Sequence, residues 1–138
     1  MHHAVELLAG AALVTLGAAF GTPARFYVSG VVARRFGETI PWGTFVVNVS
    51  GCLTMGVVAA FAYAHGLASD SEYWLLTATG FLGSYTTVSS FALQTWALLR
   101  DRQLRLAILY TVLSLVSCPA AVGAGFTCAL MAFAGQPA

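Results

Sequence analysis

The chain contains no lysine, and charged residues of any kind are few. Only 8% of its 138 residues are charged, whereas 59% are hydrophobic. In a soluble domain about a quarter of the residues are charged, so this composition excludes that class and indicates a small integral membrane protein. The net charge of +1 is uninformative by itself, and no nucleic-acid partner is expected.

Acidic residues within the apolar segments are scarcer still. Glu6 is the only one, and it lies at the end of its segment. A proton-coupled exporter of small cations needs a carboxylate well inside the membrane to exchange protons for substrate. Because Glu6 lies at the end of its segment, we keep this class of protein only as an alternative function. The charged groups also do not supply a nucleophile, a base and an orienting residue together, and no enzymatic activity is expected.

The three cysteines, Cys52, Cys118 and Cys128, show no paired spacing, and all fall within apolar segments. A metal site or a disulfide has little support from this pattern. We expect the three thiols to pack as small apolar side chains.

Four apolar segments are long enough to cross a bilayer. They cover approximately residues 4–33, 42–65, 73–99 and 105–134, and a spanning helix needs about 20 such residues. The sequence therefore predicts an all-α membrane protein in which residues 1–138 form one domain of four transmembrane helices.

The third segment is interrupted by a polar stretch from Gly80 to Phe91 that is rich in Gly, Ser and Thr. In hydrocarbon, irregular backbone persists only where protein surrounds it or where it lines a cavity. Each half of the segment has about 10 residues, so a break here would lie near the bilayer midplane. The stretch predicts either a functional site or a face of small residues that lets helices approach closely.

A stripe of small and polar residues runs along the second segment, where Thr44, Asn48 and Cys52 recur every fourth position. That spacing places them on one helical face, which must face protein. Asn48 lies about two turns inside, where an unpaired amide would cost several kcal/mol. A hydrogen bond to another helix and a contact with an anion both remain open for it.

The fourth segment carries a similar stripe of Tyr110, Ser114 and Cys118. Its hydroxyls can face a polar path or bond back to their own helix backbone. On the first segment, Gly17, Gly21 and Arg25 share one face. We interpret Arg25 as a structural anchor that reaches the headgroups, with an inward-facing arginine as the alternative.

Basic residues flank only the first and third connections. The five arginines there are Arg34, Arg35, Arg100, Arg102 and Arg105, and neither the N-terminus nor the second connection has one. The positive-inside rule predicts that loops 34–41 and 100–105 are cytoplasmic and that both termini lie outside.

Two motif blocks resemble those of the Fluc (CrcB-type) fluoride channels. The first is Pro41-Trp42-Gly43-Thr44 followed by Asn48 and Gly51, and the second is Gly80-Phe81-Leu82-Gly83 followed by Thr86-Thr87-x-Ser89-Ser90-Phe91. Gly17, Gly21 and Arg25 also fit, so that the resemblance covers essentially the whole chain.

The resemblance implies a four-helix subunit of an antiparallel dimer with two narrow fluoride pores and a central sodium ion. Its function would be passive fluoride export across the inner (plasma) membrane of a prokaryotic cell. The backbone carbonyls of Gly83 and Thr86 would hold the sodium at the dimer interface. The implied fluoride pore consists of Asn48, Phe91, Ser89, Ser90, Tyr110 and Ser114.

These residue types suit fluoride chemically. Fluoride is small and strongly hydrated, so a selective path must replace its water with donors of partial positive charge. Asn48 offers an amide N–H, serine and tyrosine offer hydroxyls, and the edge of the Phe91 ring carries partial positive charge.

Three positions depart from the family pattern. Val88 replaces the first phenylalanine of a pair, Gln94 replaces an acidic residue, and Cys118 replaces a serine. A homodimer of dual topology needs a subunit that inserts into the membrane in both orientations. The arginines of the first and third connections all lie on one side of the predicted membrane, which favours a single orientation. Both observations favour a heterodimer with a second, oppositely oriented Fluc-type subunit, and an accessory subunit with an inactive pore is a further alternative.

Overall fold

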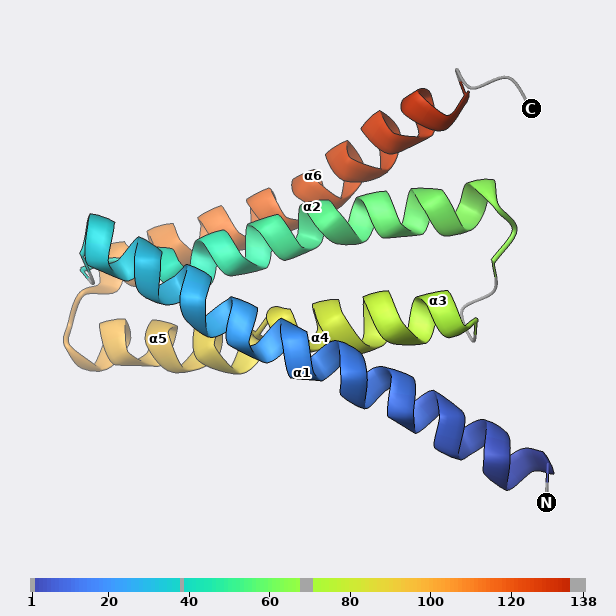
Figure 1. Cartoon of the computed structure of the whole chain (residues 1–138). Coiled ribbons are helices and arrows are strands. Elements are labelled where there is room, and N and C mark those ends of the chain that lie inside the picture. The colour runs from blue at the N-terminus through green and yellow to red at the C-terminus, as the bar shows by residue number, and fades with distance from the viewer. Residues whose placement is uncertain (1, 38, 68–70, 135–138) are drawn as a thin grey trace.

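The computed structural model describes residues 2–37, 39–67 and 71–134, and every regular element among them is helical (Figure 1). The elements in chain order are α1 (His2–Phe36), α2 (Trp42–Ala64), α3 (Glu72–Trp74), the π-helical η1 (Leu75–Leu82), α4 (Gly83–Tyr85), α5 (Val88–Arg100) and α6 (Leu104–Ala134). The predicted all-α fold of four spans with a broken third span is confirmed.

Three of the spans are single helices that are long and apolar enough to cross a membrane: His3–Phe36, Trp42–Ala64 and Leu104–Phe133. The remaining span is assembled from α3, η1, α4 and α5. α1 begins and α6 ends at the same end of the molecule, as an even number of crossings requires (Figure 1). The protein is therefore a multi-pass membrane protein.

Glycines bring the first span directly onto the third. A methyl group at Gly80 would lie 2.7 Å from the carbonyl oxygen of Val14, and one at Gly17 would lie 2.6 Å from the backbone nitrogen of Phe81. Backbone therefore packs on backbone where α1 crosses η1, and no larger residue fits. Such contacts between small residues are typical of membrane helices.

The second and fourth spans pack in the same way. A methyl group at Gly56 would lie 2.7 Å from the backbone nitrogen of Phe126, and one at Gly125 would overlap the carbonyl oxygen of Leu53. This contact fixes α6 against α2 over the middle of both helices.

The interior consists of two small clusters, and much of the outer surface is apolar. Val47, Leu82 and Tyr85 form one cluster, and Leu98, Ala107 and Tyr110 form the other. Large apolar side chains such as Phe20, Trp96 and Leu115 are more than half exposed, as lipid-facing residues are in the absence of lipid.

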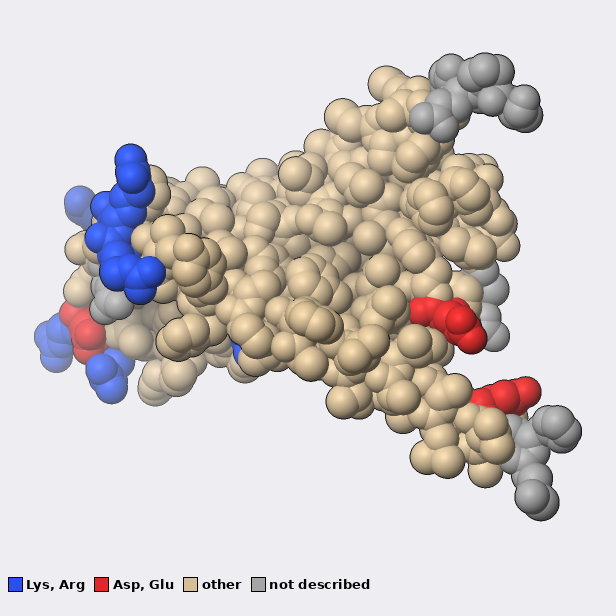
Figure 2. All heavy atoms as spheres, in the orientation of Figure 1, with Lys and Arg blue, Asp and Glu red and all other residues tan. Residues whose placement is uncertain are grey.

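The charged residues lie mainly at the two ends of the molecule (Figure 2). Basic side chains gather at the end where α1 terminates and where α5 connects to α6, and this end includes Arg34, Arg35 and Arg100. Part of the second connection, residues 68–70 with Asp70, and Glu38 in the first connection lie outside the described residues.

Candidate functional site

The third span breaks at Thr86 and Thr87, inside the polar stretch that the sequence singled out. Both residues are extended, with φ/ψ of −81°/161° and −153°/119°. The helix resumes at Val88, where the Thr87 side chain caps the new N-terminus by accepting a hydrogen bond from the Ser90 N–H at 3.2 Å. A π-helical segment precedes the break, which adds a second irregularity often found near functional sites.

Asn48 of α2 holds this break in place. Its Nδ2 donates to the Thr87 carbonyl oxygen at 2.9 Å, and its Oδ1 accepts from the Thr87 N–H at 2.8 Å. One side-chain amide thus satisfies both backbone groups of a buried residue. The hydrogen bond to another helix that the sequence left open for Asn48 is present. One N–H of its amide group is not used by these two bonds.

Two backbone carbonyls lose their helical partners because of these bonds. In a continuous helix the Thr87 N–H would donate to the Gly83 carbonyl, and the Ser90 N–H would donate to the Thr86 carbonyl. Here the side chains of Asn48 and Thr87 accept those two N–H groups instead. Gly83 is exposed and Thr86 is half-buried.

A cavity of about 350 Å³ lies beside the break. It is lined by Asn48 and Cys52 of α2, by Thr86 and Thr87, by Val88 and Phe91 of α5, and by Ser114, Leu115, Cys118 and Pro119 of α6. Three of the six expected pore residues, Asn48, Phe91 and Ser114, therefore meet at one cavity. Val88, at a position where the family pattern has phenylalanine, also lines it and is 80% exposed.

Tyr110 lies one turn before Ser114 on α6 and is 1% exposed. Its ring centroid is 5.3 Å from that of Phe91, and its hydroxyl donates to Oε1 of Gln94 at 3.2 Å. Tyr110 thus supports Phe91 and orients the amide of Gln94 rather than lining the cavity at the break itself.

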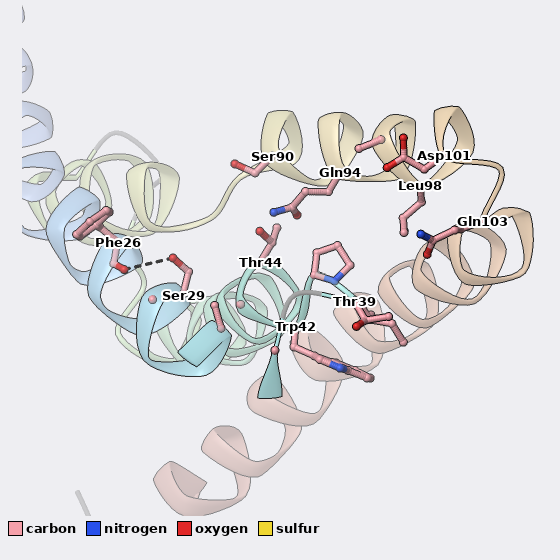
Figure 3. Close-up of a pocket in the computed structure, with 17 residues that line it drawn as sticks. Phe26, Ser29, Thr39, Trp42, Thr44, Ser90, Gln94, Leu98, Asp101 and Gln103 are labelled. Carbon is pink, nitrogen blue, oxygen red and sulfur yellow. Dashed lines mark hydrogen bonds between the residues drawn. The ribbon is translucent and has the colours of Figure 1, made fainter. Parts of the chain in front are cut away.

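Ser89 and Ser90 are placed differently from the other expected pore residues. Both hydroxyls lie 3.1 Å from Oγ1 of Thr87. Ser90 lines a cavity of about 570 Å³ near the basic end, together with Thr44 and Gln94, whose side chains point toward one another (Figure 3). The structure therefore does not bring all six expected pore residues together: three line the cavity at the break, Ser90 lines the cavity near the basic end, and Ser89 and Tyr110 line neither.

Arg25 lines a third and smaller cavity of about 260 Å³, with Thr44, Thr87 and Ser90 among its neighbours. The ion pairs of the described residues do not include Arg25. Arg25 is half-buried and faces a cavity that it shares with polar residues beside the break.

Thr87 is the residue of this site that the sequence analysis missed. It bonds to Asn48, Ser89 and Ser90 and is 8% exposed. A threonine directly before the first apolar residue of a helix, here Val88, is a usual signal of an N-cap residue. The described residues contain no group of three or more His, Cys, Asp and Glu side chains able to hold a metal ion.

These features define a class of protein: a small membrane protein of four helical spans, with a broken third span and a cavity beside the break. A family model described as "CrcB-like protein, Camphor Resistance (CrcB)" matches residues 12–126. The chain belongs to this CrcB-like family, which confirms the resemblance found in the sequence.

Several relatives are similar over most of their length. The chain is 54% identical to "Fluoride-specific ion channel FluC 2" of Rhodopseudomonas palustris, an alignment that covers 90% of this chain and 95% of that protein. It is 44% identical to "Fluoride-specific ion channel FluC 2" of Bradyrhizobium diazoefficiens, over 87% and 88% of the two chains. It is 43% identical to "Fluoride-specific ion channel FluC" of Trichormus variabilis, over 83% and 87%.

Proposed function

We propose that this chain is a subunit of a fluoride-selective channel through which fluoride leaves the cytoplasm down its gradient. Membership of the CrcB-like family and the names of its relatives support this function. The observation that carries the proposal is the cavity at the break, where Asn48, Phe91 and Ser114 come together from three helices.

The geometry of Asn48 suggests how fluoride is stabilised there. The two bonds with Thr87 fix the orientation of the amide and leave one N–H unused. That N–H, the Ser114 hydroxyl and the edge of the Phe91 ring present partial positive charge without a formal cation. Such donors replace the water of fluoride while still allowing the ion to leave.

The carbonyls of Gly83 and Thr86 are the proposed ligands of a structural sodium ion. Sodium prefers hard oxygen ligands, and the diverted N–H groups of Thr87 and Ser90 release these two oxygens from helical bonding. In the proposed dimer, the corresponding oxygens of a second subunit would complete the site. The charge of the sodium would then favour an anion path nearby.

We further propose that the second subunit is an oppositely oriented Fluc-type chain and that a heterodimer is the working channel. The basic end carries arginines from both predicted cytoplasmic loops, 34–41 and 100–105, which favours one orientation with both termini outside. Several relatives have numbered names, such as FluC 3 and FluC 4 of Brucella species, which agrees with more than one chain per organism.

The alternatives gain no support. Glu6, the only acidic residue in an apolar segment, lies exposed near the start of α1 beside His3, far from the break, and this does not favour a proton-coupled exporter. The relatives are named as channels, which does not favour an accessory subunit with an inactive pore.

Reconstitution into liposomes tests the function. Liposomes containing this chain, alone and together with an oppositely oriented family member, are loaded with fluoride or with chloride, and anion efflux is measured with an ion-selective electrode. We expect fluoride efflux well above chloride efflux, and flux that requires the partner would support the heterodimer. Absence of fluoride efflux under both conditions would refute the proposed function.

A further inference from the structure

Two thiols from different helices meet at the cavity beside the break. Cys52 of α2 and Cys118 of α6 are 66 positions apart in the sequence, yet both line this cavity. Both are free and partly exposed. Cys128, the third cysteine, is exposed and is not among the residues that line this cavity, so it offers a natural comparison.

The helices that carry the two thiols are held at a fixed separation. One turn after Cys52, Gly56 packs directly on the backbone of Val122 and Phe126 of α6. Gly125 in turn packs on the carbonyl group of Leu53, the residue that follows Cys52. Because no side chain separates the helices at these points, the two helices stay close together beside the cavity that both cysteines line.

We propose that Cys52 and Cys118 form a two-coordinate site for a soft monovalent metal cation such as Cu(I) or Ag(I). Thiolates select soft metals, whereas the oxygen ligands proposed for sodium select hard ones. The described residues offer no cluster of three or more His, Cys, Asp and Glu ligands, which disfavours the tetrahedral coordination that zinc requires. Two opposed sulfur ligands suit a d10 cation that accepts a linear geometry.

Metal binding changes the charge of the cavity in a defined way. Each thiol loses its proton to water, two metal–sulfur bonds form, and no electron is transferred. Two neutral thiols and one monovalent cation become a bis-thiolate complex of charge −1 with release of two protons. This negative charge lies in the same cavity as Asn48 and Ser114, so it repels fluoride and occupies its path. This block rests on the proposed function, whereas the metal site itself does not.

Silver titration of the purified, intact protein tests the site directly. Calorimetry in chloride-free buffer with Ag⁺ as the probe should show one tight site per chain, and X-ray absorption should show two sulfur ligands. Cys52→Ser and Cys118→Ser should each lose the tight site, because serine keeps the size but not the soft ligand. Cys128→Ser should retain it.

Fluoride efflux measured in liposomes with and without Ag⁺ tests the block. We expect Ag⁺ to inhibit the unmodified channel and the Cys128→Ser variant, with recovery when a small dithiol removes the metal. Each of the other two serine variants should keep its own flux when Ag⁺ is added.

Three outcomes would overturn the site: no silver bound by the unmodified chain, a silver affinity in Cys52→Ser and Cys118→Ser equal to that of the unmodified chain, or a single sulfur ligand in the absorption spectrum. Size-exclusion profiles of the variants separate loss of ligand from loss of fold. If no sample conducts fluoride, the proposed function fails, but the titration and the absorption spectrum still decide the metal site.

Discussion

At the scale of single residues, the structure shows one of the two roles that the sequence left open for Asn48 and is compatible with the other. Its amide bonds to both backbone groups of Thr87 and also lines the cavity at the break. A structural hydrogen bond and a contact with an anion are compatible because the amide group has one more N–H than the structure uses. The orientation that the bonds with Thr87 fix would also suit the proposed contact with fluoride.

Substitution of Asn48 separates these two roles. In Asn48→Asp, one carboxylate oxygen still accepts from the Thr87 N–H, but the donor is lost and a negative charge enters the cavity. We expect fluoride efflux from liposomes to be abolished. In Asn48→Ala, both Thr87 groups lose their partner, which should destabilise the protein by about 1–3 kcal/mol for each group left unsatisfied. Undiminished efflux in Asn48→Asp would contradict a place for Asn48 on the anion path.

Thr87 gives a test of the proposed sodium ligands. Thr87→Val removes the hydroxyl that accepts the Ser90 N–H, which then becomes free to return to the Thr86 carbonyl. We expect a weaker sodium dependence of the thermal unfolding temperature, since bound sodium stabilises the folded state by mass action. Loss of the helix cap should itself cost about 0.5–2 kcal/mol.

The matched control is Thr87→Ser, which keeps the hydroxyl and therefore the cap. It should retain the sodium dependence of the unmodified protein. An equal sodium response in the valine and serine variants would show that Thr87 does not control a sodium site.

At the scale of helices, direct backbone contact decides how the spans pack. Gly80→Ala would place a methyl group 2.7 Å from the Val14 carbonyl oxygen and force α1 away from η1. Overpacking of this kind typically costs about 1–3 kcal/mol, so the thermal unfolding temperature in detergent should fall. Because η1 leads into the break, fluoride efflux should fall with it.

Gly123→Ala is the matched control, because Gly123 also lies within a helix but has no neighbouring atom within 4 Å of an added methyl group. Its unfolding temperature should be unchanged or slightly raised, since alanine favours a helix more than glycine does. A similar loss of stability in both variants would show that helix contact is not what Gly80 provides.

The helices themselves were predictable, whereas their pairing was not. Bilayer thickness sets the length of an apolar span, so the predicted segment 42–65 matches α2 at Trp42–Ala64, and 105–134 matches α6 at Leu104–Ala134. The break was predictable because polar backbone in hydrocarbon is costly. The bonds from Asn48 to Thr87 depend on which helix lies beside the break, and spacing along one segment carries no such information.

The same reason explains what the sequence could not resolve at the site. Ser89 and Ser90 are neighbours of Phe91 in the chain, yet Ser90 lines the cavity near the basic end, and Thr87 lies between these serines and the cavity of Asn48. Cys52 and Cys118 were expected to be ordinary small side chains, because nothing in their spacing places α6 against α2. The roles of these residues in conduction stay predictions.

At the scale of the whole molecule, the distribution of charge gives the chain a direction. Basic residues gather at one end, and the two loops that supply them contain five of the six arginines. Such a bias should impose one orientation in the membrane, with loops 34–41 and 100–105 in the cytoplasm. A subunit with one orientation cannot form an antiparallel dimer with itself. The orientation of the chain therefore decides whether a second, unlike subunit is needed.

Labelling with a membrane-impermeant thiol reagent tests the orientation of the chain in the membrane. Gln103→Cys, placed between α5 and α6 in a chain whose native cysteines are replaced by serine, should be labelled only after the cytoplasmic face is exposed. Replacing Arg34, Arg35, Arg100, Arg102 and Arg105 by alanine should produce labelling from both sides, because the charges that hold these loops inside are gone.

Labelling of the Gln103→Cys chain from both sides with all arginines in place would contradict a fixed orientation. The same chain would then be free to pair with itself, and the case for a second, unlike subunit would be lost.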